Sequence, residues 1–306
     1  MDRNSVDWCG YLPAITTPFD EDRKLDVSAL GRLLEWLQGE GMHGLVIAGT
    51  TGEWFSLSAV ERQALFRAAG AQLRGKVPLI AGCNAFTPAE VIELAGHAHA
   101  YGFDGILVTP PPYMVPGDEE IVEFYRRVSD SVQLPICVYN WPPGTNVDMS
   151  GEVLGRLAEL ERVVAIKNST RHLDRFVKSF FALKDRVRYF GFSMDELGAT
   201  LVRVHGGDGT MGAGAVLGRD HPDFYNHLWR GDLAAALACG ARDRRILEDW
   251  FTDALTGRFG SAQSILKEAL NVQGLPGGYP RSPLLELTAS HRARVHATLQ
   301  KLGRVA

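Results

Sequence analysis

Short runs of apolar residues alternate along the chain with longer segments in which apolar positions recur every three or four residues. The short runs are apolar at nearly every position, as strands covered on both faces are. We predict eight strands, of which the last is rich in glycine. They are Tyr11–Ile15, Gly44–Ala48, Leu79–Gly82, Gly105–Val108, Ile136–Tyr139, Val163–Ile166, Val187–Phe190 and Gly209–Gly214.

The segments between these strands have the spacing of amphipathic helices. In the first of them, leucines at positions 30, 33, 34 and 37 fall on one face. Helices are predicted at Val27–Leu37, Ser58–Leu73, Pro88–His99, Glu119–Val132, Gly151–Leu160 and Leu173–Leu183. Repeated strand–helix units predict parallel strands with right-handed crossovers, and eight such units favour a closed barrel over an open sheet.

The pattern changes after about Arg219, beyond which no strand is predicted. Helices are expected at Asp232–Leu255, Ser261–Asn271 and Leu284–Leu302, with a loop rich in glycine and proline at Gln273–Pro283. We therefore predict an α/β fold: a (β/α)8 TIM barrel over residues 1–225 and a C-terminal helical bundle over residues 226–306. A barrel of about 250 residues is a common single unit, so 306 residues accommodate both parts.

Composition narrows the classes of function. The net charge is −4 and no run is rich in Lys or Arg, which argues against nucleic acid as a partner. No apolar stretch approaches the roughly 18 residues of a membrane helix, and Met1–Gly10 does not resemble a secretory signal, so a cytoplasmic protein is expected. The four cysteines form no CxxC pair, which makes a zinc site or a disulfide framework unexpected.

Reactive side chains follow three of the predicted strands, at the barrel end where such enzymes hold their active sites. The turn Gly49-Thr50-Thr51-Gly52-Glu53 offers backbone N–H groups and hydroxyls to a carboxylate. Tyr139 ends the fifth strand, and Lys167 follows four apolar residues at the end of the sixth. A lysine in such a low-dielectric place has a lowered pKa, and the neutral amine can attack a carbonyl.

Each of these features also has a purely structural interpretation. The turn is compatible with an ordinary glycine-rich loop, Tyr139 with a core tyrosine, and Lys167 with a side chain that reaches water past the strand end. Together they indicate more than they do singly, because a 2-keto acid presents both a carboxylate and a carbonyl to such a rim.

These motifs, in this order and spacing, resemble the dihydrodipicolinate synthase / N-acetylneuraminate lyase family over essentially the whole chain. The matching segments are Pro13–Phe19, Gly49–Glu53, Thr109–Tyr113, Tyr139-Asn140, Ile166-Lys167 and Gly206–Gly209.

The resemblance implies a TIM barrel with a C-terminal helical domain, most often a homotetramer, although a dimer stays possible. It implies that Lys167 forms a Schiff base with pyruvate or a related 2-keto acid and that Tyr139 shuttles protons. Thr50 and Thr51 would bind the carboxylate, and Tyr113 would complete a hydroxyl relay with Thr51 across a subunit interface. No metal or organic cofactor is expected.

Two departures from the family concern the second substrate. Members that make dihydrodipicolinate carry an arginine five residues after the equivalent of Tyr139, and it receives the carboxylate of the second substrate. This chain has Gly144 there, so Arg156 or Arg171 would have to substitute. Trp141 and Met194 are expected to narrow the mouth. The full set of candidate substrate-binding residues is Gly49, Thr50, Thr51, Ser169, Asp195, Glu196 and Met211.

Asp195 and Glu196 resemble the acidic pair of the lyase and sugar-acid aldolase branches, which holds substrate hydroxyls. An equally good interpretation is that Asp195 caps the seventh barrel helix and that Glu196 lies in its first turn.

Several hypotheses stay open. The first is an aldolase or lyase that acts on pyruvate or a 2-keto-3-deoxy sugar acid. The second is a dehydratase with the same imine chemistry, and the third is 4-hydroxy-tetrahydrodipicolinate synthase, which Gly144 disfavours. A non-catalytic 2-keto-acid sensor and a metal-dependent aldolase are the alternatives from other classes, the latter disfavoured because no ligand spacing is present.

Overall fold

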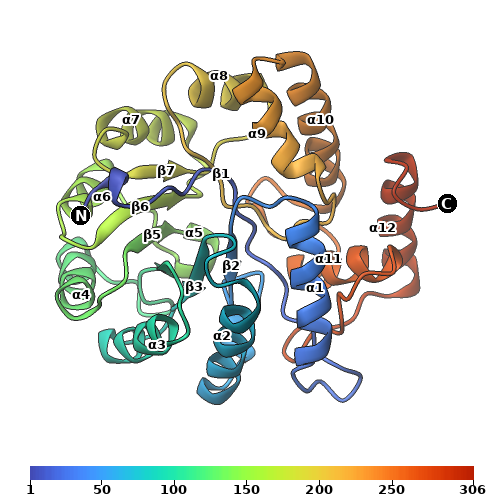
Figure 1. Cartoon of the computed structure of the whole chain (residues 1–306), viewed down its shortest axis with the longest axis horizontal. Coiled ribbons are helices and arrows are strands. Elements are labelled where there is room, and N and C mark those ends of the chain that lie inside the picture. Colours follow the sequence, from blue (N-terminus) through green and yellow to red (C-terminus); the bar gives the residue numbers. More distant parts are fainter.

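Eight parallel strands form the centre of the protein in a computed structural model that describes all 306 residues (Figure 1). Neighbouring strands follow the order β1-β8-β7-β6-β5-β4-β3-β2. Ala14, just after β1, bridges in parallel to both Val46 of β2 and Ala213 beyond β8, which closes the ring. The strands are β1 Gly10–Tyr11, β2 Leu45–Ile47, β3 Leu79–Gly82, β4 Gly105–Val108, β5 Ile136–Asn140, β6 Val163–Asn168, β7 Arg188–Phe190 and β8 Gly209–Thr210.

Helices surround the strands, as their apolar faces require (Figure 1). Several begin at predicted caps: in α2 the Ser58 side chain accepts from the Glu61 N–H, and the Glu61 side chain accepts from the Ser58 N–H. The helices of this part are α1 Val27–Gly39, α2 Ala59–Leu73, α3 Pro88–Ala100, α4 Asp118–Ser131, α5 Pro142–Thr145, α6 Gly151–Ala158, α7 Leu173–Leu183, α8 Glu196–Arg203 and α9 Asp220–Arg230. Two single turns of 3-10 helix lie at Arg3–Ser5 and Trp54–Ser56.

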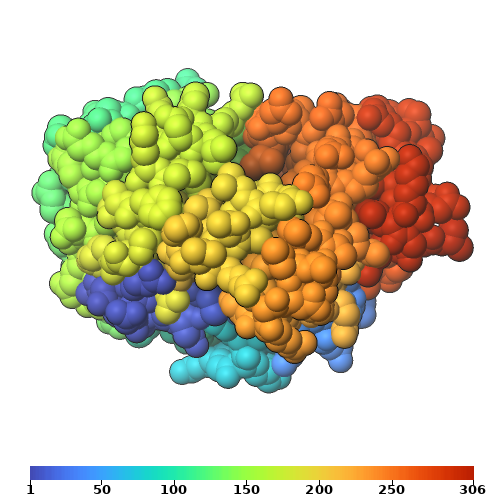
Figure 2. Space-filling view, turned by 90° about the horizontal axis from the view of Figure 1, so that it is seen from above, coloured from blue at the N-terminus to red at the C-terminus, as the bar shows by residue number.

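Three further helices complete the chain: α10 Leu233–Trp250, α11 Ala262–Val272 and α12 Ala289–Lys301. They pack along one side of the strand-and-helix ring, with α12 outermost (Figures 1 and 2). None of the helices has both the length and the apolarity needed to cross a membrane.

The helices of this last region differ from the prediction in three places. α10 ends at Trp250 rather than Leu255, because the chain leaves the helix at Phe251, which forms an antiparallel bridge with Gly257. α12 begins at Ala289 rather than Leu284, where the Thr288 side chain caps it. α9 was not predicted at all, and the predicted division between residues 225 and 226 falls inside it.

The apolar core has two parts. Twelve buried residues, among them Val46, Tyr139 and Met211, fill the inside of the strand ring. A larger cluster of 68 residues lies between the strands and the helices and includes Ile265 and Leu299 of the last helices. The last helices therefore share an apolar core with the rest of the chain.

Candidate active site

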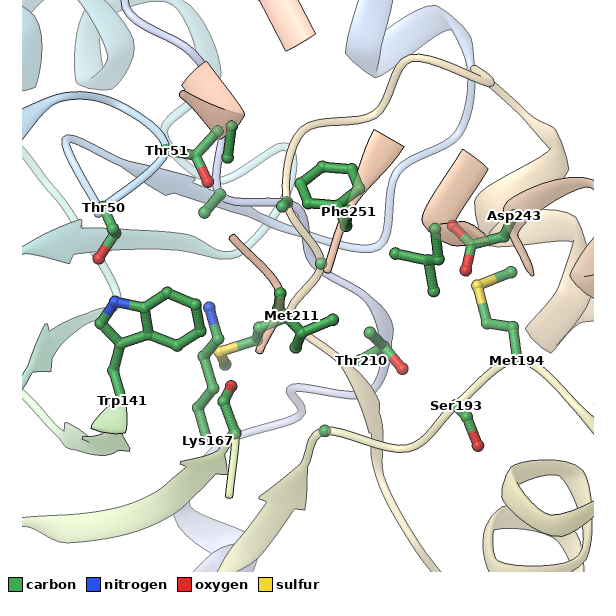
Figure 3. Close-up of a pocket in the computed structure, with 18 of the residues that line it drawn as sticks. Thr50, Thr51, Trp141, Lys167, Ser193, Met194, Thr210, Met211, Asp243 and Phe251 are labelled. Carbon is green, nitrogen blue, oxygen red and sulfur yellow. The ribbon is translucent and has the colours of Figure 1, made fainter. Parts of the chain in front are cut away.

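A cavity of about 700 Å³ opens at the carboxyl ends of the strands (Figure 3). One side is formed by residues that follow β2, β5, β6, β7 and β8, and the other by residues of α8, α10 and the segment up to α11. Six of the predicted site residues line it: Thr50, Thr51, Tyr139, Lys167, Ser169 and Met211.

Lys167 lies at the centre of the strand-end side. Strand β6 holds its backbone in register between Tyr139 of β5 and Phe190 of β7, and only 7% of the residue is exposed. Its Nζ lies 4.0 Å from the centroid of the Tyr139 ring. Burial lowers the pKa of Lys167 to about 8, and Cys137 acts in the opposite direction. The amine is therefore neutral in about a tenth of molecules at pH 7, far more than for an exposed lysine.

Tyr139 presents its phenol to the same space. Its ring stacks on Trp141 with a centroid separation of 5.8 Å. Burial raises the pKa of Tyr139 above its ordinary value, and a hydrogen bond with the Ser169 side chain opposes that effect. The phenol stays protonated and can donate to an oxygen bound near Lys167.

The turn after β2 brings the two threonines to the cavity. The Glu53 N–H and Gln263 Nε2 both donate to the Thr50 carbonyl oxygen and so hold the backbone of the turn. Neither threonine hydroxyl is used in these bonds, and both remain available to a ligand. Glu53 has a positive φ of 57° and forms an ion pair with Lys267, both side chains being fully buried. Arg281 donates its backbone N–H to the Glu53 carboxylate over 3.0 Å.

A network of buried amides fixes the ends of β5 and β6. Asn140 Nδ2 donates to Asp148 Oδ1 at 2.8 Å and to Asn168 Oδ1 at 2.9 Å. Asn168 in turn donates to the Tyr189 hydroxyl at 2.8 Å. Since Asn140 and Asn168 directly follow Tyr139 and Lys167, this network orients the two reactive side chains. Sequence reasoning assigned no role to Asp148 or Tyr189.

Four predicted site residues lie outside the cavity lining of this chain. The Asp195 side chain accepts from the Gly198 N–H at 2.9 Å and is the N-cap of α8, the structural alternative. Glu196 points to solvent beside Arg244. Gly49, the first residue of the turn, is buried, and Tyr113 is 90% exposed on the loop after β4.

The substitute cations proposed from the sequence differ in position. Arg171 lines the cavity, whereas Arg156 forms a two-pronged ion pair with Glu119 elsewhere on the surface. Trp141 and Met194 line the cavity as expected. Asp243 and Phe251 of the last third also line it (Figure 3), and no sequence signal pointed to either.

Titratable groups do not gather as metal ligands in this structure. No three His, Cys, Asp or Glu side chains lie close enough together to hold a metal ion.

Comparison with known proteins agrees with the geometry. The model of the dihydrodipicolinate synthetase family matches residues 7–302. A 4-hydroxy-tetrahydrodipicolinate synthase of Phenylobacterium zucineum is 37% identical over 295 residues, covering 96% of this chain and 97% of that protein. An uncharacterized DapA-like lyase of Rhizobium meliloti is 29% identical over 298 residues, with 97% of each chain covered.

Solved structures give the same picture. Dihydrodipicolinate synthase from Thermotoga maritima superimposes with a TM-score of 0.86 at 26% identity, covering 97% of this chain and 99% of that one. The chloride-inhibited enzyme from Acinetobacter baumannii, complexed with pyruvate, has a TM-score of 0.85 at 27% identity, with coverage of 97% and 99%. This chain therefore belongs to the dihydrodipicolinate synthetase family and is a lyase of the class I, Schiff-base type.

Proposed function

We propose that Lys167 forms an imine with the carbonyl carbon of pyruvate or a related 2-keto acid, and that the enzyme then makes or breaks the bond between C3 and C4. The observation that carries this proposal is the burial of Lys167 without a carboxylate partner, beside the Tyr139 ring and in the same cavity as the Thr50 and Thr51 hydroxyls.

Each side chain then has a definite task. Neutral Lys167 attacks the carbonyl, and Tyr139 donates the proton with which the carbinolamine oxygen leaves as water. Thr50 and Thr51 hold the carboxylate through their hydroxyls. The protonated imine accepts electrons either from the C3–C4 bond or from a departing C3 proton.

Tyr113 requires a second subunit for its proposed relay role, because in its own chain it lies outside the cavity. We accordingly propose a homotetramer in which this loop reaches a neighbour. We also propose that residues 226–306 act as a helical unit, although they share an apolar core with the barrel.

A second candidate is 4-hydroxy-tetrahydrodipicolinate synthase, which the names of several relatives favour. The site gives this activity little support, because Gly144 stands where such synthases carry an arginine. The Trp141 indole lies over Gly144, and a Cβ at that position would be only 2.5 Å from Trp141 Cδ1. Condensation of pyruvate with aspartate semialdehyde tests this activity directly. Release of pyruvate from a 2-keto-3-deoxy acid separates cleavage from dehydration.

The decisive experiment traps the imine. The protein is mixed with pyruvate, reduced with borohydride, and analysed by intact and peptide mass. We expect a reduced pyruvate adduct on the peptide that contains Lys167, and none in Lys167→Ala. Lys178→Ala, at an exposed lysine of α7, is the matched control and should label fully. A folded wild-type protein that forms no adduct with any 2-keto acid would contradict the proposal.

A further inference from the structure

The two ends of the cavity differ in how their polar groups are used. At the Lys167 end, the amine and the Thr50 and Thr51 hydroxyls are available to a ligand, and Tyr139 shares its phenol only with Ser169. This end is equipped for the carboxylate and carbonyl of a 2-keto acid. The other end, near Met194 and Asp243 in Figure 3, differs in three respects.

First, the polar side chains of the far end are engaged within the protein. Ser193 Oγ donates to Asp195 at 2.8 Å, and Thr210 Oγ1 donates to the Phe192 carbonyl oxygen at 2.5 Å. His221 Nε2 lies 3.1 Å from Asp243 Oδ1, and Thr256 pairs with the Thr252 hydroxyl at 2.8 Å. A polyol tail would find these hydroxyls already bonded to other protein groups.

Second, the far wall is apolar. It is formed by side chains from the loop before α8, from α8 and α10, and from the segment that follows α10: Met194, Leu197, Ile246, Leu247, Phe251 and Leu255. Leu197, Leu247 and Leu255 are 43%, 38% and 42% exposed, and all three line the cavity. Exposed leucines that converge on one concave surface indicate a binding site for an apolar ligand.

Third, the charges disfavour an anionic tail. Asp243 is the only carboxylate in the lining, and its side chain is 17% exposed. Lys167 and Arg171 are the only lysine and arginine of the lining, and Arg171 is exposed, three residues beyond β6. A second carboxylate on the substrate would face an apolar wall and a like charge at this end.

We propose that the natural substrate is a 2-keto acid whose chain beyond C4 is uncharged and apolar, either aromatic or long aliphatic, with its tail against Leu197, Leu247 and Phe251. This inference rests on the proposed imine at Lys167 and specifies its partner. In the direction of synthesis, pyruvate C3 loses a proton and bonds to the carbonyl carbon of an apolar aldehyde. The aldehyde oxygen gains a proton, and water then releases a 4-hydroxy-2-oxo acid from Lys167.

Competitive trapping tests the inference independently of reaction direction. Equal concentrations of 2-oxooctanoate, 2-oxoglutarate and 2-keto-3-deoxygluconate are mixed with the protein, reduced with borohydride, and the adducts on the Lys167 peptide are quantified by mass. We expect the octanoate adduct to exceed each of the others by about tenfold or more, the usual discrimination of an apolar pocket. An equal or larger share of the dicarboxylate or sugar-acid adduct overturns the inference while leaving the imine intact. No adduct from any of the three, nor from pyruvate, overturns the proposed function itself.

Two substitutions locate the effect. Leu247→Asn in α10 should reduce the preference for 2-oxooctanoate by about tenfold and leave pyruvate trapping unchanged. Leu233→Asn, at a similarly exposed leucine of the same helix outside the cavity, should change neither. Leu197→Asn repeats the test from α8 if Leu247→Asn unfolds. An unchanged preference in a folded wall variant counts against the apolar subsite.

Discussion

Lys167 and Lys267 are both buried lysines whose pKa burial lowers to about 8, yet their surroundings differ. Lys267 forms an ion pair with Glu53 and donates to the Tyr279 carbonyl oxygen at 2.7 Å, so its charged form is held in place. Lys167 has the face of an aromatic ring and an open cavity beside it. A buried amine that is free to react is the one that can become a nucleophile.

The pKa of Lys167 gives a pH dependence with a definite sign. The neutral amine is the reactive form, so imine formation should increase as the pH rises through about 8 and level off above it. Between pH 7 and pH 9 the initial rate of pyruvate trapping should increase about tenfold. Samples incubated at each pH and reduced under one common condition supply the measurement. A rate that still increases tenfold per pH unit above pH 9 would indicate a lysine of ordinary pKa.

Tyr139→Phe removes one hydroxyl and keeps the ring that covers Lys167. Turnover should fall by roughly 10²–10⁴-fold, the usual size of a lost acid–base group, while an adduct still accumulates on long incubation. Single-turnover kinetics with pyruvate provides the measurement. Thr298→Val, at a buried threonine of α12 whose hydroxyl donates to Asp249 away from the cavity, is a control for the general loss of a buried hydroxyl. Normal turnover in Tyr139→Phe would exclude the proton-transfer role.

Some of these residues were accessible from the sequence and others were not. Lys167 and Tyr139 could be predicted because each ends a strand whose apolar run is unmistakable, and strand ends share one rim. Asp195 shows where sequence reasoning stops. An acidic residue before a helix is compatible with both a capping role and a substrate-binding role, and only the hydrogen bond from the Gly198 N–H distinguishes the two.

Among the secondary-structure elements, the turn after β2 and helix α11 are tied together by a buried ion pair. Glu53 belongs to the turn that carries the two threonines, and Lys267 belongs to α11. Arg281 reinforces the junction with bonds to Glu53 and to Glu61 of α2. The last third of the chain therefore helps to hold the turn of Thr50 and Thr51 in place.

Lys267→Met should lower the free energy of unfolding by about 3–5 kcal/mol, because it leaves the Glu53 carboxylate buried without its partner. Lys24→Met is the matched control: Lys24 and Asp22 form an exposed pair with side chains 76% and 77% accessible, and its loss should cost less than about 0.5 kcal/mol. Denaturant unfolding of both variants provides the measurement. Equal effects would show that the buried pair has no special importance for stability.

The elements themselves were predicted best where periodicity is strong. Leu173–Leu183 of α7 begins and ends as predicted, whereas α9 was missed because Pro222 and five Asp, His and Arg side chains interrupt its apolar pattern. Leu284–Leu287 looks like the start of a helix by spacing alone, yet it precedes the Thr288 cap. The spacing of apolar residues alone does not show whether a helix starts at the first apolar residue or only at a later capping residue.

For the whole molecule, what the sequence could not show is the docking of the last helices over the strand ends. Asp243, Leu247 and Phe251 are more than 70 residues beyond Lys167 in the chain, and no motif links them to it. Their place in the cavity follows from packing between α10, α9 and the strand ring. The spacing of apolar residues predicts contacts only within one element or one strand–helix unit.

The proposed tetramer can be tested through the loop after β4. Tyr113, Met114 and Val115 are 90%, 62% and 53% exposed, an apolar surface that a neighbouring subunit would cover. Met114→Asp should shift the sedimenting species of wild-type protein towards smaller multiples of the 33.5 kDa chain. Val60→Asp, at a 75% exposed residue of α2, is the control and should sediment as wild type. A wild-type protein that sediments as a monomer would contradict the relay role of Tyr113.

If both proposals hold, one cavity contains two separate groups of residues, one that activates the substrate and one that selects it. Lys167 and the Thr50 and Thr51 hydroxyls lie at the strand ends, whereas much of the opposite wall comes from residues 243–263. Grafting this stretch between relatives should therefore transfer preference for the substrate tail while the imine chemistry stays behind. New specificities can arise in this scaffold through changes in a segment that never touches the reacting carbon.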